Sequence, residues 1–211
     1  MLVDTFLYAG ERDLLEMRMC ELSEVVDLFV CVEGTLTFQG KPRTLDLSLP
    51  RQSNFTHIVV SDFPEASEHN PWKREMFQRN AILRGLQGLR DDDLIMVSDV
   101  DEIPDASIIP TYLANGEVYR FRQQLFQFNF NNMVTNDQSA RLGWNNTTIC
   151  RLDDLRRWYP QGVRNMTDRI AIVEGGWHFS FFHNPLDKIN AYSHIELKDM
   201  PGTLQERVQQ R

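Results

Sequence analysis

Three short apolar runs constrain the fold of this chain more than any other feature of its sequence. They cover residues 27–32 (DLFVCV), 55–61 (FTHIVVS) and 93–98 (DLIMVS). Runs of this kind are typical of strands in a parallel sheet that is covered on both faces. Residues 1–8 (MLVDTFLY) predict a further strand. The sequence therefore predicts an α/β fold.

Two helical patterns lie between the predicted strands. Residues 11–26 carry apolar side chains at helical spacing, namely Leu15, Met19, Leu22 and Val26. Residues 71–89 form the second pattern, which has Pro71 at its first turn and Arg79 on an otherwise apolar stripe. Strands that alternate with helices indicate α/β layering with helices on both faces of the sheet.

The second half of the chain is less regular. Residues 118–131 alternate apolar and polar side chains and predict one long or two short strands, and 153–158 predict the start of a short helix. Residues 170–173 and 177–182 predict two strands separated by a pair of glycines.

We interpret the whole chain, 1–211, as a single domain. Its nucleotide-binding half covers about 1–105, and a mixed half of about 106–211 completes the sheet and forms a second binding surface.

The charge balance argues against a nucleic-acid partner. The chain has 22 basic and 30 acidic side chains, for a net charge of −8, whereas non-specific nucleic-acid binding needs a basic surface. No apolar run reaches the roughly 18 residues of a transmembrane helix, and the first residues lack the pattern of a signal peptide. Three cysteines without a CxxC pair indicate free thiols in a reducing compartment. These features predict a cytoplasmic protein.

An acidic cluster directly follows the apolar run 93–98. It contains Asp99, Asp101 and Glu102, and Pro104 closes it. In extended backbone, Asp99 and Asp101 project to the same side while Val100 points into the core. Two carboxylates at the carboxyl end of a parallel strand predict a site for Mg²⁺ or Mn²⁺, or for a diphosphate. The alternative is a solvated acidic turn.

A second candidate lies in the segment GGWHFSFFH, residues 175–183. Its glycines permit close approach of the backbone to a ligand, and His178 is either a ligand of the same cation or a core residue between aromatics. Lys188 and His194 either meet phosphate oxygens or lie on a solvated helix.

Two charged side chains in the first half have two interpretations each. Arg79, in the segment 73–80 that ends at Asn80, is either a helix-end salt bridge or a group aimed at a ligand. Glu33 follows the apolar run 27–32. It is either an acceptor for ribose or base hydrogen bonds or a simple strand-end charge.

Taken together, these motifs resemble glycosyltransferase family 17 over roughly residues 4–196. The resemblance is carried by Asp4-Thr5-Phe6, ERDLLEMR (11–18), residues 26–33, TFQGKP (37–42), and residues 74–86, 98–104 and 176–182. It implies a GT-A-like fold, a nucleotide-sugar donor such as UDP-GlcNAc, a glycan acceptor and inversion at the anomeric carbon.

The resemblance also implies roles for particular residues. Asp101 would bind the metal directly, Asp99 would reach the metal, a bound water or the ribose, and His178 would complete the metal shell. The remaining donor contacts would come from Glu33, Arg79, Asn80, Lys188 and His194.

An inverting displacement needs one general base for the acceptor hydroxyl. We favour Glu174, with Asp154, Asp153 and Glu102 as further candidates. Two alternatives to the transferase stay open at this point. One is a phosphatase of the haloacid dehalogenase type with Asp99 as nucleophile, and the other is a metal-dependent carbohydrate-binding protein without enzymatic activity.

Overall fold

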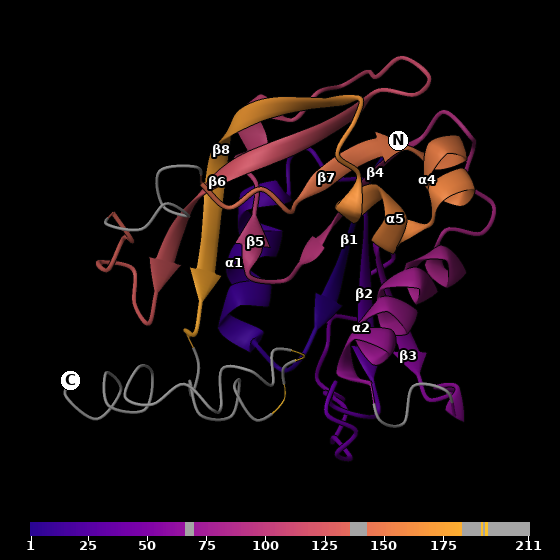
Figure 1. The fold of residues 1–211 in the computed structure, drawn as a ribbon, viewed down its shortest axis with the longest axis vertical. Helices are drawn as coiled ribbons and strands as arrows, with labels where there is room; N and C mark the ends of the chain where they lie inside the picture. The colour runs from indigo at the N-terminus through magenta and orange to yellow at the C-terminus, as the bar shows by residue number, and fades with distance from the viewer. Residues whose placement is uncertain (66–69, 136–142, 183–190, 192, 194–211) are drawn as a thin grey trace.

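The computed structural model describes residues 1–65, 70–135, 143–182, 191 and 193. Within them lies one sheet of eight strands in the order β3-β2-β1-β4-β7-β6-β8-β5 (Figure 1). Its first four strands are β1 (Leu2–Tyr8), β2 (Leu28–Gly34), β3 (Phe55–Val60) and β4 (Leu94–Asp99), and they are all parallel. The three apolar runs and the strand predicted over residues 1–8 are therefore confirmed as the parallel half of the sheet.

The other four strands are of mixed direction. They are β5 (Glu102–Ile103), β6 (Val118–Gln127), β7 (Thr148–Arg151) and β8 (Ile170–Ser180). Strand β7 runs antiparallel to β4 and β6, whereas β8 is parallel to β6 and antiparallel to β5. The predicted mixed C-terminal half is confirmed.

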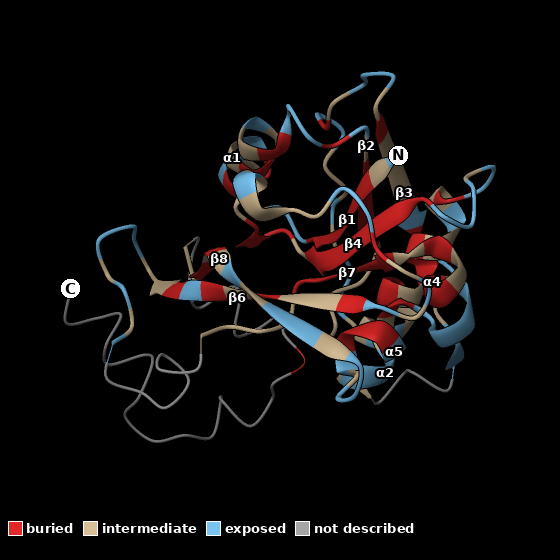
Figure 2. Ribbon diagram, turned by 90° about the horizontal axis from the view of Figure 1, so that it is seen from above, coloured by how far each residue is buried: buried red, intermediate tan, exposed pale blue. Residues whose placement is uncertain are grey.

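Helices cover both faces of the sheet (Figure 2). Helix α1 (Arg12–Leu22) lies on one face, and α2 (Pro71–Asn80), α4 (Leu152–Trp158) and α5 (Pro160–Asn165) lie on the other. Short 3₁₀ turns are η2 (Ala81–Gly85) and η3 (Ala106–Ile108).

Alternate residues of the strands supply two separate cores. In β2, Phe29 and Cys31 pack with Leu15 of α1, whereas Val30 and Val32 pack into the core that contains Ile82 of η2. This period-2 alternation within continuous apolar strands is what fixes one face of the sheet against α1 and the other against α2, α4 and α5.

The boundaries of several predicted elements differ from those observed. The predicted helix 71–89 is α-helical only to Asn80 and continues as η2, which places Gly85 against Val30 of β2. Strands β5 and β7 and helix α5 are absent from the prediction, because segments of two to six residues carry too few positions to show a period.

The glycine pair does not separate two strands, contrary to the prediction. Strand β8 runs through Gly175 and Gly176, and its register against β6 shifts there by one residue, which makes a bulge. Gly176 has φ +96°, and a Cβ at that position would lie 2.4 Å from the carbonyl oxygen of Ile103. The glycine thus lets β8 pass close to the chain that follows β5.

Gly176→Ala is therefore expected to destabilise the fold by about 3 kcal/mol or more, since it combines a left-handed backbone with a clash against main-chain atoms. Gly88→Ala is the matched control, because Gly88 has φ +81° but nothing within 4 Å of its added Cβ. Urea denaturation measures both variants. Equal losses would show that close packing at Gly176 is unimportant.

Two further expectations concern the thiols and the membrane. Cys20, Cys31 and Cys150 are free, as predicted, with Cys20 exposed and the other two buried. Among the described residues, no helix combines the length and the apolar character needed to cross a membrane.

Candidate active site

The acidic cluster lies at the carboxyl ends of the parallel strands. A pocket at this edge is lined by the ends of β1 and β4, by the segments that follow β1, β2 and β4, and by α2, among them Tyr8, Glu11, Phe38, Glu75, Asp99 and Asp101. Ligands of open α/β sheets bind at this edge.

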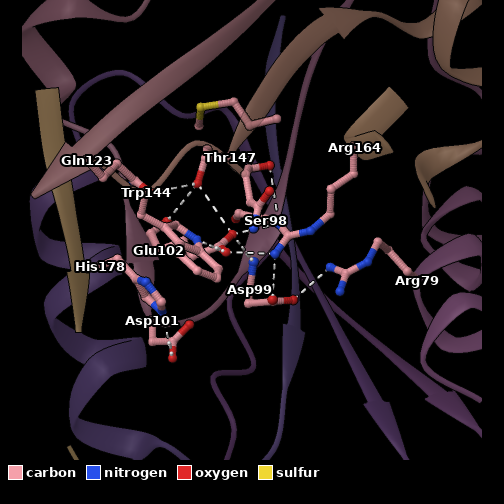
Figure 3. A network of polar contacts seen from close by, with 12 residues as sticks. Arg79, Ser98, Asp99, Asp101, Glu102, Gln123, Trp144, Thr147, Arg164 and His178 are labelled. Atoms are coloured by element: carbon pink, nitrogen blue, oxygen red, sulfur yellow. Dashed lines mark hydrogen bonds and ion pairs between the residues drawn. The ribbon is translucent and has the colours of Figure 1, made fainter. Parts of the chain in front are cut away.

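The sequence predicted that Asp99 and Asp101 project to the same side of an extended strand. The structure shows a different arrangement. Strand β4 ends at Asp99, and residues 100–101 form a tight turn into β5. Val100 is buried in the core as predicted. Figure 3 shows the Asp99 carboxylate turned toward two arginines and the Asp101 carboxylate turned toward His178. The turn, rather than strand alternation, sets these directions.

Asp99 bridges two helices through ion pairs. One of its oxygens lies 2.7 Å from Arg79 of α2 and the other 2.8 Å from Arg164 of α5 (Figure 3). Burial alone would raise the pKa of Asp99, but the charges of Arg164 and Arg79 outweigh it and hold that pKa below its ordinary value. These ion pairs stabilise the folded chain above about pH 4 and are lost as the pH falls through the lower folded pKa.

Glu102 is completely buried, and its carboxylate binds several groups at the turn. Its two oxygens accept from Arg164 at 2.7 Å each, and one of them also accepts the backbone N–H of Asp99 at 2.9 Å. Burial lowers the pKa of Arg164, but the charges of Asp99 and Glu102 raise it overall. Glu102 was one candidate for the general base, and its carboxylate is instead occupied by structural contacts.

A second buried ion pair, between Arg18 and Asp4, lies next to the turn and contacts its backbone. Arg18 of α1 and Asp4 of β1 are both fully buried and pair at 2.6 Å. Arg18 also donates to the carbonyl oxygens of Asp99 and Glu102, at 3.2 and 2.7 Å, and to the hydroxyl of Ser98. The backbone on both sides of Asp101 is thereby fixed to α1.

Asp101 and His178 lie side by side. Strand β8 brings His178 opposite Glu102 of β5, and the His178 Nε2 lies 3.5 Å from an Asp101 oxygen. Both side chains are almost fully buried, with exposed fractions of 6% for His178 and 3% for Asp101. The Trp144 ring covers the imidazole, with 4.3 Å between ring centroids.

The other predicted donor contacts are held by neighbouring residues. Arg79 pairs with Glu75 and donates through its Nε to the side-chain oxygen of Gln161, and the Asn80 side chain accepts from the Gln161 backbone N–H. Glu33 is buried at the end of β2 beside His57 and Arg43, at 3.0 and 3.5 Å. Arg79 contacts Asp99 of the acidic cluster, whereas Asn80 contacts Gln161, and Glu33 contacts His57 and Arg43.

The predicted bases do not meet the acidic cluster. Glu174 is 68% exposed and pairs with Arg122 across β6 and β8, four residues before His178. Asp154 accepts the Gly116 N–H, and its helix follows β7 at the opposite end of β4, where the Leu152 N–H bonds the Asp93 carbonyl. Lys188 and His194 lie outside the described residues.

The sequence analysis missed Arg164, Arg18 and Asp4. Arg18 had a detectable signal, because it lies three residues after Leu15 and four before Leu22 on the buried stripe of its helix. A charged residue on such a stripe requires a buried partner. Arg164 had no such signal, since its helix covers only six residues.

Asp101 and His178 are suited to a divalent cation together, and Asp99 is not in the same position. No group of three or more His, Cys, Asp or Glu side chains in the described part of the chain is arranged to hold a metal ion. A Mg²⁺ or Mn²⁺ ion needs only one or two protein ligands when waters and phosphate oxygens fill its other positions. The buried Nδ1 of His178, which has no hydrogen-bond partner in the described part of the chain, is a second ring nitrogen on that residue.

Comparisons with protein families and with curated proteins both find glycosyltransferases. A model of glycosyltransferase family 17 matches residues 1–211. Human β-1,4-mannosyl-glycoprotein 4-β-N-acetylglucosaminyltransferase is 32% identical over 106 residues, which cover 44% of this chain and 20% of the human protein. The protein of the same name from Rattus norvegicus matches with the same identity and coverage. The chain thus spans about a fifth of the length of these curated relatives.

Among solved structures, a similar fold occurs in 2-C-methyl-D-erythritol 4-phosphate cytidylyltransferase from Francisella tularensis. The TM-score is 0.48 and the sequence identity 14%, with 90% of this chain and 97% of that chain covered.

Proposed function

The chain belongs to glycosyltransferase family 17, and from that premise we propose that it transfers N-acetylglucosamine from UDP-GlcNAc to a glycan hydroxyl with the help of Mn²⁺ or Mg²⁺. The sugar is N-acetylglucosamine in this proposal because the curated relatives are N-acetylglucosaminyltransferases by name. The observation that carries the proposal is the pairing of His178 with Asp101, which lines the strand-end pocket.

The charges of the pocket support a role in leaving-group departure. A departing nucleoside diphosphate gains negative charge, which a divalent cation stabilises as a Lewis acid. Asp101 and His178 would hold that cation. Arg79 and Arg164 keep Asp99 ionised, and their own charges are balanced by Glu75, Asp99 and Glu102.

The acceptor hydroxyl must lose its proton to a carboxylate. Of the two predicted bases, the geometry favours Glu174, because it shares β8 with His178, whereas Asp154 lies at the other end of β4. Glu174 would have to release Arg122 to act as the base. Both assignments stay predictions.

The family match favours the transferase over both alternatives. Asp99, the nucleophile of the phosphatase alternative, has each oxygen in an ion pair with an arginine. A carbohydrate-binding module that holds its metal through Asp101 would not need a second carboxylate, Asp99, paired with two arginines.

Isothermal titration with UDP, with and without Mn²⁺, tests the proposed function. We expect UDP binding that depends on Mn²⁺, followed by nucleotide release from UDP-GlcNAc in a panel of UDP- and GDP-sugars. UDP binding that ignores Mn²⁺, combined with hydrolysis of a generic phosphoester, would favour the phosphatase. Sugar binding without UDP binding would favour the module. The predicted cytoplasmic location is a separate question that this experiment does not address.

A further inference from the structure

His178 lies beside Asp101 and has few polar contacts that fix the direction of its ring. A metal-binding imidazole is normally oriented by a hydrogen bond from its second nitrogen. Here the buried Nδ1 has no hydrogen-bond partner among the described residues. The Nε2 lies 3.5 Å from Asp101, which is long for a hydrogen bond. Something other than a second-nitrogen hydrogen bond must therefore hold the imidazole plane.

The Trp144 ring packs against the His178 imidazole. The two ring centroids are 4.3 Å apart, and the ring planes make an angle of 37°. The backbone of Trp144 is fixed in turn by two hydrogen bonds with Gln123 of β6, each 2.9 Å long. Figure 3 shows Trp144 between His178 and the Glu102 carboxylate.

Glu102 fixes the indole. The Trp144 Nε1 donates to a Glu102 oxygen at 2.5 Å. The same carboxylate binds Arg164 and the Asp99 N–H. The fully buried Glu102 side chain thereby contacts both the backbone of Asp99 and the indole that covers His178.

We propose that Trp144, anchored by Glu102, is the positioning residue that orients the His178 imidazole toward Asp101. In consequence, Glu102 sets the positions of both Asp99 and His178 without touching the substrate. The expected effect of Trp144 on metal binding rests on the proposed function. The expected effect of Trp144 on the orientation of His178 rests on the ring contact alone.

Two measurements on the full chain test it. The first is the NMR chemical shift of the His178 imidazole protons in the ligand-free protein, assigned with His178→Gln, because a stacked indole shifts these protons upfield. The second is the Mn²⁺-dependent affinity for UDP. Trp144→Leu removes the ring, Trp144→Phe keeps a ring but removes the N–H, and Glu102→Gln weakens the anchor. Trp72→Leu is the control, since Trp72 is half exposed on α2.

We expect Trp144→Leu to abolish the upfield shift and to weaken Mn²⁺-dependent UDP binding about 10- to 100-fold, as the loss of an outer-sphere partner does. Trp144→Phe and Glu102→Gln should each give intermediate shifts and smaller losses. Adding Glu102→Gln to Trp144→Leu should cause no further change in the His178 shift, because the anchor acts through the ring. The control should match the wild type in both measurements.

The proposal is wrong if folded Trp144→Leu keeps the His178 shift, or if it binds UDP with Mn²⁺ within twofold of wild type. If Trp144→Leu does not fold, Trp144→Phe decides, and an unchanged His178 shift in that variant overturns the proposal. If the wild type binds no UDP with Mn²⁺, the proposed function fails. The NMR comparison of the wild type with Glu102→Gln, which keeps the indole, still decides whether Glu102 holds the Trp144 ring over His178.

Discussion

Asp101→Asn should reduce Mn²⁺-dependent UDP binding by at least about 100-fold, because it removes the negative charge from the carboxylate beside His178. The fold should survive. The backbone contact that holds this position, from the Phe179 N–H to the Asp101 carbonyl at 2.8 Å, does not involve the side chain. Thermal unfolding and isothermal titration on the same preparation separate the two effects.

Asp153→Asn is the matched control for Asp101→Asn. Asp153 is a partly exposed aspartate that pairs with Arg151 at the far end of β7, so this variant should bind UDP and Mn²⁺ like the wild type. Normal binding by Asp101→Asn would remove Asp101 from the metal site. It would leave the family assignment in place, since that assignment does not depend on this side chain.

Arg18→Met should cause the largest loss of stability among single substitutions at the site, about 3–5 kcal/mol. Removing one member of a buried ion pair leaves the other charge buried without compensation. Asp4 would be that charge, because it is fully buried and both of its oxygens accept from Arg18, at 2.6 and 2.7 Å. The carbonyl oxygens of Asp99 and Glu102 would lose a donor as well.

Urea denaturation of a double-mutant set measures this loss. Asp4→Leu combined with Arg18→Met should recover part of the stability, since replacing both charges by apolar groups removes the uncompensated charge. Arg12→Met is the control, because the Arg12–Glu16 pair is solvent-exposed and contributes less than about 1 kcal/mol. If Arg18→Met costs no more than Arg12→Met, the buried pair does not support the site.

The parallel half of the fold was predictable because its physics is local. Burial on both faces demands apolar side chains at every strand position, so β2 and β4 were evident in the sequence. The acidic cluster was detectable for the same reason, since charge directly after a buried strand is conspicuous. Strand β7 and helix α5 were not predictable, because their short segments carry no period.

The predicted pair of parallel aspartate side chains was wrong because it was inferred from neighbouring residues alone. It assumed extended backbone through Val100, whereas the chain turns there, with Arg18 holding the carbonyls and Glu102 holding the Asp99 N–H. These contacts join residues up to 84 positions apart in the chain. Spacing along the sequence contains no information about such partners.

By itself, the sequence determined the α/β architecture, the position of the acidic residues at a strand end, and the family. Each of these depends on the order of side chains along short stretches of backbone. Only the tertiary structure decided that Asp99 faces Arg79 and Arg164 while Asp101 faces His178. The reason is that a buried charge takes its direction from whichever opposite charge the packing of distant helices and strands brings within reach.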